Sequence, residues 1–154
     1  MTKSLEGIAI RLMTIGDYEQ VYDLWINTPG MGLNSIDDTR EGIAKYLKRN
    51  PTTCFVAVDG GEIAGVILCG HDGRRGVVHH TAVKESLRRR GVGKALWDQA
   101  AAALRKDGIT KAWLVVKGYN EGGNLFWEGL DFQQRDDLKF KSITLDQTLV
   151  RIDT

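Results

Sequence analysis

The sequence predicts a mixed α/β (α+β) domain with about seven strands and about four helices. Three observations indicate this class. Short β-branched runs alternate with longer segments in which apolar residues recur every three or four positions. Turns at 59–61 and 71–76 join three of the apolar runs directly, which predicts an antiparallel meander. A helical segment separates the fourth run from the fifth, so these two strands are expected to be parallel.

The first part of the chain contributes one strand and two helices. Residues 8–13 are β-rich and alternate, which predicts a strand. An apolar stripe with helical spacing follows Asp17, a candidate N-cap, and predicts a helix. The glycine-rich stretch 28–32 ends this helix. Asp37 or Asp38 is expected to cap the second helix.

The remaining elements are predicted from the same two patterns, which are alternation for strands and apolar residues every three or four positions for helices. Strands are predicted over 53–58, 63–69, 77–83 and 111–116, and then at Phe132 and over 138–145. Helices are predicted over 91–106, which Gly108 ends, and over 120–130. No repeat or low-complexity linker interrupts this order, so residues 1–154 are expected to form a single domain.

Composition narrows the classes of function. Of the 154 residues 42% are hydrophobic and 27% are charged, and the formal net charge of +1 gives no bulk attraction for a nucleic acid. Cys54 and Cys69 lie in apolar runs without metal-ligand spacing, so we expect reduced thiols and no metal. No apolar run approaches the roughly 18 residues of a membrane span. We therefore expect a cytoplasmic protein with no nucleic-acid or membrane partner.

The strongest functional signal follows the strand predicted over 77–83. Gly91 and Gly93 lie at the start of the next helix, where main-chain N–H groups lack partners and the helix dipole is positive. Glycine lets a phosphate approach the main chain closely. Four cations surround this turn: Arg88, Arg89, Arg90 and Lys94. The pattern predicts a pyrophosphate site.

Two commoner phosphate-binding motifs do not fit this turn. A P-loop with Gly93 and Lys94 as its Gly-Lys pair would need glycine in place of Arg88 and a hydroxyl in place of Ala95. A dinucleotide motif, G-x-G-x-x-G, would need glycine in place of Leu96. The segment contains instead R-x-x-G-x-G, in which Arg88, Gly91 and Gly93 directly follow a strand.

This motif resembles that of the GNAT superfamily of acyl-CoA-dependent N-acetyltransferases, and the predicted order of elements is similar to the GNAT fold over most of the chain. The resemblance implies that strands four and five splay apart around acetyl-CoA. It also implies that the main-chain N–H of Val83 polarises the thioester carbonyl, an oxyanion-hole role. The residues implied to bind acetyl-CoA are Ala82, Val83, Arg88, Arg89, Arg90, Gly91, Val92, Gly93, Lys94, Ala95, Asn120 and Phe126.

A second family pattern, N-x-x-A-x-x-F-Y followed by G-F, is similar to NEGGNLFW over 120–127 and DF over 131–132. The resemblance implies that Asn120 bonds the pantetheine arm, although Asn120 is equally a candidate N-cap. Phe126 is implied to pack on the arm. Trp127 stands where the family often has a tyrosine that protonates the leaving thiolate, and because tryptophan is no acid, we expect it to pack.

His79 and His80 are candidate bases. An amine with a pKa of about 10.4 must lose a proton before it is acylated, and an imidazole near 6.5 suits that task. Neighbours on a strand point to opposite faces, so at most one histidine is expected to face the cleft. Some members of the family carry histidine at the position of His79, which we therefore prefer. Water-mediated proton transfer without a histidine is the alternative.

The sequence says less about the site for the amine that accepts the acetyl group, which we call the acceptor side. Trp25, Met31 and Leu33 are candidates for its lining, with core packing as the alternative. The resemblance implies that a small-molecule or peptide primary amine attacks acetyl-CoA directly in a ternary complex. Neither cysteine lies near the expected cleft. A non-catalytic acyl-CoA-binding sensor on the same fold is the alternative function, and a homodimer is left open.

Overall fold

The computed structural model describes residues 5–154, whose main sheet has the strand order β1-β3-β4-β5-β6. Its strands are β1 (Ile8–Leu12), β3 (Phe55–Asp59), β4 (Glu62–His71), β5 (Gly76–Val83) and β6 (Ala112–Leu114). All neighbours are antiparallel except β5 and β6, which are parallel. β2 (Leu33–Asn34) and β7 (Arg151–Ile152) form a separate antiparallel pair. The predicted mixed sheet, its meander and its parallel pair are confirmed.

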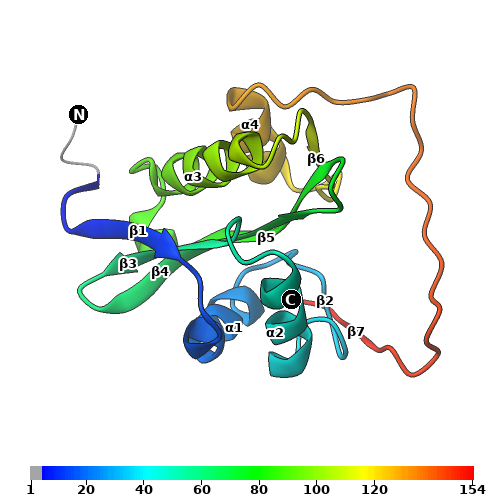
Figure 1. Ribbon diagram of the computed structural model, residues 1–154, viewed down its shortest axis with the longest axis horizontal. Helices are drawn as coiled ribbons and strands as arrows, with labels where there is room; N and C mark the ends of the chain where they lie inside the picture. The colour runs from blue at the N-terminus through cyan, green and yellow to red at the C-terminus, as the bar shows by residue number, and fades with distance from the viewer. Residues whose placement is uncertain (1–4) are drawn as a thin grey trace.

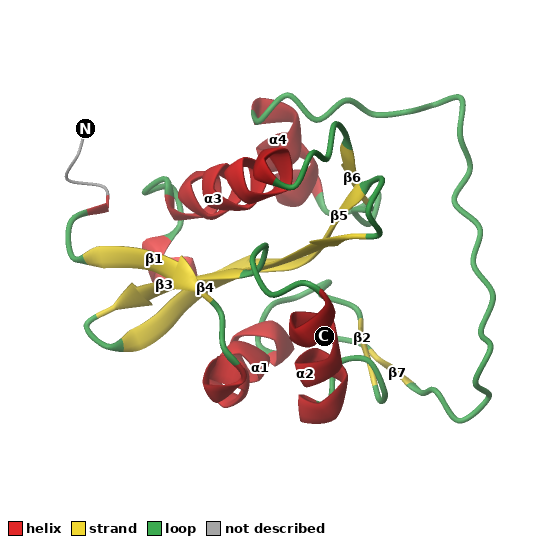
Figure 2. Ribbon diagram, viewed as in Figure 1, coloured by secondary structure: helices red, strands yellow, loops and turns green. Residues whose placement is uncertain are grey.

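Two layers of helices cover the faces of this sheet (Figures 1 and 2). α1 (Tyr18–Ile26) and α2 (Arg40–Arg49) lie on one face, and α3 (Val92–Lys106) and α4 (Glu121–Gly129) lie on the other. Short 3-10 turns, η2 (Ile15–Asp17) and η3 (Glu85–Leu87), come before α1 and α3. Within residues 5–154 no helix is both long enough and apolar enough to cross a membrane.

The buried core follows from the alternation of side chains along the central strands. Val66 and Leu68 of β4 belong to the cluster beneath α1 and α2, whereas Ile67 and Cys69 belong to the cluster beneath α3. Burying an aliphatic side chain fully stabilises the fold by roughly 1.5–3 kcal/mol. Both faces of β4 are therefore anchored, and the neighbouring β5 is held in a fixed position between the two layers.

Gly65 allows α3 to lie close to the sheet. A Cβ atom at this position would be 3.2 Å from Leu96 Cδ1 and 3.3 Å from Val92 Cγ1, two buried side chains of the first turns of α3. Gly65 also pairs with Val83, the last residue of β5. The close contact therefore fixes the N-terminus of α3 beside the end of β5.

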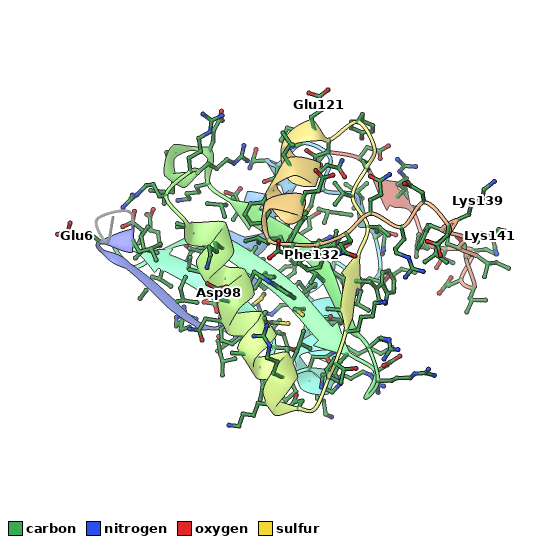
Figure 3. The ribbon with its side chains drawn as sticks, turned by 90° about the horizontal axis from the view of Figure 1, so that it is seen from above. Glu6, Asp98, Glu121, Phe132, Lys139 and Lys141 are labelled. Atoms are coloured by element: carbon green, nitrogen blue, oxygen red, sulfur yellow. The ribbon has the colours of Figure 1, made fainter. Side chains whose placement is uncertain are left out.

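The two final strands predicted at Phe132 and over 138–145 are wrong. Residues 133–150 form no strand and run outside the sheet before the chain reaches β7 (Figure 3). The apolar side chains of this segment that alternate in sequence are at least 61% exposed: Leu138, Phe140, Ile143 and Leu145. Alternation produces a strand only where another strand supplies hydrogen bonds, and within residues 5–154 none does so here.

The cap of α2 also differs from the prediction. The N-cap is Thr39, whose Oγ1 accepts a hydrogen bond from the N–H of Gly42 at 3.0 Å. Asp37 and Asp38 precede this cap. Asp38 is buried, and its carboxylate bonds to groups outside α2 instead.

Candidate active site

β5 and β6 separate after three paired residues. β6 pairs with Gly76–Val78 only, while β5 continues to Val83. The N–H of Lys84 donates to the main-chain oxygen of Ala64 at 2.8 Å. Along an antiparallel strand, the N–H and C=O groups of successive residues point alternately toward the partner strand and away from it. The main-chain groups of Thr81 and Val83 therefore face away from β4, toward the gap. The predicted splay of the two parallel strands is present.

The N-terminus of α3 presents main-chain amides at the same end of β5. Its N-cap is Gly91, which has a φ of 84° and no side chain to accept from the first turn. Arg89 has a φ of 63°, a left-handed conformation that is uncommon outside glycine. These two positions form the tight turn before the helix. The N–H groups and the positive end of the helix dipole are thus directed out of the first turn.

The four predicted cations differ in their contacts. Arg88 Nε donates to the main-chain oxygen at the end of β5 at 3.1 Å, and Arg90 Nη2 donates to another main-chain oxygen at 3.4 Å. Lys94 pairs with Asp98 on the surface of α3 at 2.7 Å. Arg88 and Arg89 are exposed. Lys94 is exposed too, but Asp98 already pairs with it, so the two exposed guanidinium groups are better placed to bind an anion at this turn.

The two residues predicted around α4 have different surroundings, and only Phe126 packs against the start of α3. Asn120 is the N-cap of α4, and its Oδ1 accepts from the N–H of Gly123 at 2.9 Å. A Cβ at Gly93 would lie 2.9 Å from Cζ of Phe126, so glycine is required for the ring to pack against the start of α3. Trp127 is buried and packs edge-on against neighbouring aromatic rings.

A β-bulge changes the expected arrangement of His79 and His80. The pairing of β4 with β5 shifts at this point, so both histidines lie opposite the single residue Leu68. The pairs that flank the shift are Ile67 with Thr81 and Cys69 with Val78. Strict alternation therefore fails here.

As a result, the two histidines do not face opposite sides of the sheet as predicted. The ring of His79 lies edge-on to Tyr46 of α2, with ring centroids 5.7 Å apart. The ring of His80 lies edge-on to Trp25 of α1, with centroids 5.0 Å apart. Both imidazoles contact the layer formed by α1 and α2.

His80 is held by a buried carboxylate to which the sequence pattern assigns no catalytic role. His80 Nε2 lies 2.8 Å from Oδ1 of Asp38, a residue that is 3% exposed. Asp38 Oδ2 accepts from the N–H of Asn34 at 2.8 Å. When the Nε2–H group donates a hydrogen bond to the carboxylate, Nδ1 carries no proton. Its lone pair can then accept a proton from a substrate. His80 and Asp38 are 42 residues apart in sequence, so no local sequence pattern predicts that they form a pair.

His79 leads to a prediction about stability against pH. Desolvation by its surroundings, and secondly the nearby His80, hold the pKa of His79 below its ordinary value. As the pH falls below about 6.5, this histidine therefore binds a proton in the unfolded chain, whereas in the folded chain it does so only at a lower pH. The free energy of unfolding decreases over this range. His79→Gln is expected to reduce this loss. Thermal unfolding between about pH 7.5 and about pH 5 measures it, and identical slopes for the two proteins would contradict the prediction.

The acceptor-side candidates are corrected by the structure. Trp25 is 0% exposed and Leu33 is 1% exposed, so both pack in the core rather than line a surface. Met31 is only partly buried. The indole N–H of Trp25 has no hydrogen-bond partner among the described atoms. Of the three candidates, Met31 is the one that reaches the surface.

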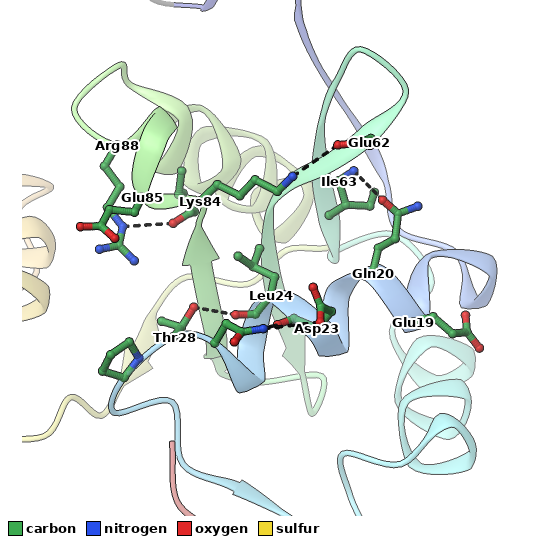
Figure 4. Close-up of a pocket in the computed structure, with 13 residues that line it drawn as sticks. Glu19, Gln20, Asp23, Leu24, Thr28, Glu62, Ile63, Lys84, Glu85 and Arg88 are labelled. Atoms are coloured by element: carbon green, nitrogen blue, oxygen red, sulfur yellow. Dashed lines mark hydrogen bonds and ion pairs between the residues drawn. The ribbon is translucent and has the colours of Figure 1, made fainter.

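A groove of about 720 Å³ runs between α1 and the end of β5 (Figure 4). Val83 and Arg88 form part of its wall, so the groove adjoins the end of β5 and the turn before α3. The charged residues that line it are Glu19, Asp23, Glu62, Lys84, Glu85 and Arg88. Lys84 pairs with Glu62 at 3.6 Å on the side of the groove that the sheet forms. Carboxylates outnumber cations in this lining.

Comparison with known proteins identifies the family. A model of the acetyltransferase (GNAT) family matches residues 18–132, which include both histidines and the turn before α3. Acetyltransferase SG1711 of Sodalis glossinidius is 30% identical over 129 residues, which cover 84% of this chain and 89% of the relative.

Two solved structures share the fold. Ard1 from Thermoplasma volcanium has a TM-score of 0.74 at 23% identity, with 82% of this chain and 83% of that chain covered. The ribosomal-protein-S18-alanine N-acetyltransferase from Escherichia coli has a TM-score of 0.67 at 20% identity, with coverage of 83% and 79%. With the match to the family model, these likenesses lead to one conclusion: the chain belongs to the GNAT family and is an acyltransferase.

Proposed function

We propose that the chain, acting as a single domain over residues 1–154, transfers an acetyl group from acetyl-CoA to a primary amine of a small molecule or peptide. The observation that carries the proposal is the unpaired edge of β5, which ends beside the N-terminus of α3. Pantetheine contains amides that can pair with an exposed strand edge. A diphosphate complements a helix N-terminus. The residues present therefore fit acetyl-CoA, which the family uses.

In this proposal the two halves of the ligand meet different elements. Thr81 and Val83 offer main-chain groups to the pantetheine arm, and Phe126 packs beside it. The diphosphate is bound by main-chain amides from Gly91 to Lys94 and by the guanidinium groups of Arg88 and Arg89. The N–H of Ala95 already donates to the main-chain oxygen of Gly91 at 3.0 Å. Asn120 keeps its capping role while its amide group stays close to the arm. When bound, acetyl-CoA supplies the acetyl group as an activated thioester.

The chain contributes proton transfer and charge stabilisation to the reaction. We assign the base to His80 rather than His79, because His80 has the buried carboxylate partner Asp38. His80 Nδ1 takes the proton of the attacking amine, and Asp38 stabilises the resulting imidazolium. The N–H of Val83 donates to the thioester oxygen. The amine nitrogen bonds to the thioester carbon to give a tetrahedral adduct. The C–S bond breaks as this adduct collapses, and the electron pair of that bond leaves with the CoA thiolate.

A direct attack in a ternary complex is supported by the state of the cysteines. Cys54 and Cys69 are buried, and burial raises the pKa of each thiol to about 12. The thiolate is the nucleophilic form, and such a pKa leaves almost none of it at neutral pH. Neither cysteine is therefore suited to carry the acetyl group covalently.

A sensor that binds acetyl-CoA without turnover is the second candidate. It is favoured by one observation, the burial of Trp127 where the family often has an acidic phenol. The free thiol is already a fair leaving group with a pKa of about 8.5, so the loss of this acid does not by itself prevent transfer. We therefore rank the enzyme above the sensor.

Titration calorimetry with acetyl-CoA and a screen of amines with a thiol-release readout test the proposal. We expect a dissociation constant below about 1 mM, which corresponds to about −4 kcal/mol, and thiol release that depends on one class of amine. Binding without release across peptides, amino acids and polyamines would favour the sensor. Absence of binding would remove both candidates.

A further inference from the structure

Residues 150–154 are bonded to the loop over 28–35, although they are far apart in sequence. β7 pairs with β2, with Ile152 opposite Leu33 and Arg151 opposite Asn34. The main-chain oxygen of Val150 accepts from the N–H of Ser35 at 2.9 Å, and Ser35 Oγ accepts from the N–H of Val150 at 2.8 Å. We call residues 150–154 the strap.

Thr154 makes the densest set of contacts between the strap and the loop. Its Oγ1 donates to the main-chain oxygen of Thr28 at 2.7 Å and accepts from the N–H of Met31 at 2.9 Å. Its main-chain oxygen accepts from the N–H of Gly30 at 3.2 Å. One threonine therefore satisfies three main-chain groups in a glycine-rich stretch that has little regular structure of its own.

The two ends of this loop lie at the candidate active site. Thr28 lines the groove that reaches the end of β5. At the other end, the N–H of Asn34 donates to Asp38 Oδ2, and the second oxygen of that carboxylate holds His80. A shift of the loop would therefore move both a wall of the groove and the partner of the base. β2 and β7 lie on the face of the sheet opposite α3, away from the turn before α3 (Figure 1).

We propose that the strap positions the acceptor side of the active site, so that Thr154 sets the affinity for the amine and not for acetyl-CoA. The inference rests on the proposed function, and it adds that the groove and the loop over 28–35 belong to the amine side. Thr154 is a positioning residue: it acts through Thr28, Met31 and the β2–β7 pair, and it touches neither substrate.

The test compares Thr154→Val, which removes both Oγ1 hydrogen bonds, with Thr154→Ser, which keeps them. Thr148→Val is the matched control, because the Thr148 hydroxyl bonds only locally to Asp146 in the exposed segment outside the sheet. For Thr154→Val we expect the KM for the amine to rise about tenfold. We expect kcat and the dissociation constant for acetyl-CoA to stay within about twofold. Thr154→Ser and Thr148→Val are expected to match the wild type.

Amide hydrogen exchange supplies a readout that does not depend on turnover. In Thr154→Val the amides of Gly30 and Met31 are expected to exchange at least about tenfold faster than in the wild type. Faster exchange with an unchanged KM, or unchanged exchange, would overturn the inference. A wild-type protein that acetylates no amine would refute the proposed function, and with it the role in amine affinity. The exchange rates would still decide whether the strap holds the loop.

Discussion

His80→Gln is expected to lower kcat/KM for the amine by about 10²–10³-fold while acetyl-CoA binding is retained. Glutamine can still donate to Asp38, so the buried carboxylate keeps a partner, but glutamine cannot accept a proton at neutral pH. Asp38→Asn is expected to lower kcat as well, because the amide no longer stabilises an imidazolium at the 2.8 Å contact. Steady-state kinetics with the amine found in the screen measure both effects.

The chain contains a matched control for this experiment in a second His–Asp pair. His71 Nε2 lies 3.0 Å from Asp107 Oδ2, but this pair lies at a turn on the surface, away from the groove. His71→Gln and Asp107→Asn are expected to leave kcat/KM within about twofold of the wild type. Full activity in His80→Gln, together with a large loss in His79→Gln, would move the base to His79 and refute the role of Asp38.

The parts of the fold that the sequence predicts are those whose signal is local. The hairpins on either side of β4 follow from glycine-containing turns between alternating runs. The order of strand β5, basic turn and helix α3 follows from residues within 28 positions of one another, from Val77 to Leu104. The turn before α3 could be located for the same reason, since Gly91 and the arginines before it are contiguous.

The errors arise where a distant partner decides the structure. Asp38 has the local signature of a helix cap, but His80 and the N–H of Asn34 bind its carboxylate, and Thr39 caps α2 instead. The bulge that places both histidines on the same side depends on the register of β5 against β4, which local alternation does not encode. The segment 138–145 has the period of a strand but no neighbouring strand to pair with.

The largest effect on binding is expected for the double variant Arg88→Ala/Arg89→Ala, which should weaken acetyl-CoA binding by about 100-fold or more. Each guanidinium group that bonds a phosphate oxygen contributes about 1.5–3 kcal/mol. The loss of two such contacts is at least about 3 kcal/mol, which corresponds to more than two orders of magnitude in the dissociation constant. Titration calorimetry at fixed ionic strength measures the change.

Arg105→Ala/Lys106→Ala removes the same charge from the last turn of the same helix. If binding is driven by the turn before α3, this control leaves the dissociation constant within about threefold of the wild type, because a charge at the far end of α3 is screened. Equal weakening by the two double variants would mean that net charge attracts the ligand, and the turn would lose its assigned role. A selective loss in Arg88→Ala/Arg89→Ala ties binding to the arginines of the turn itself, the feature from which the chemistry of this chain is inferred.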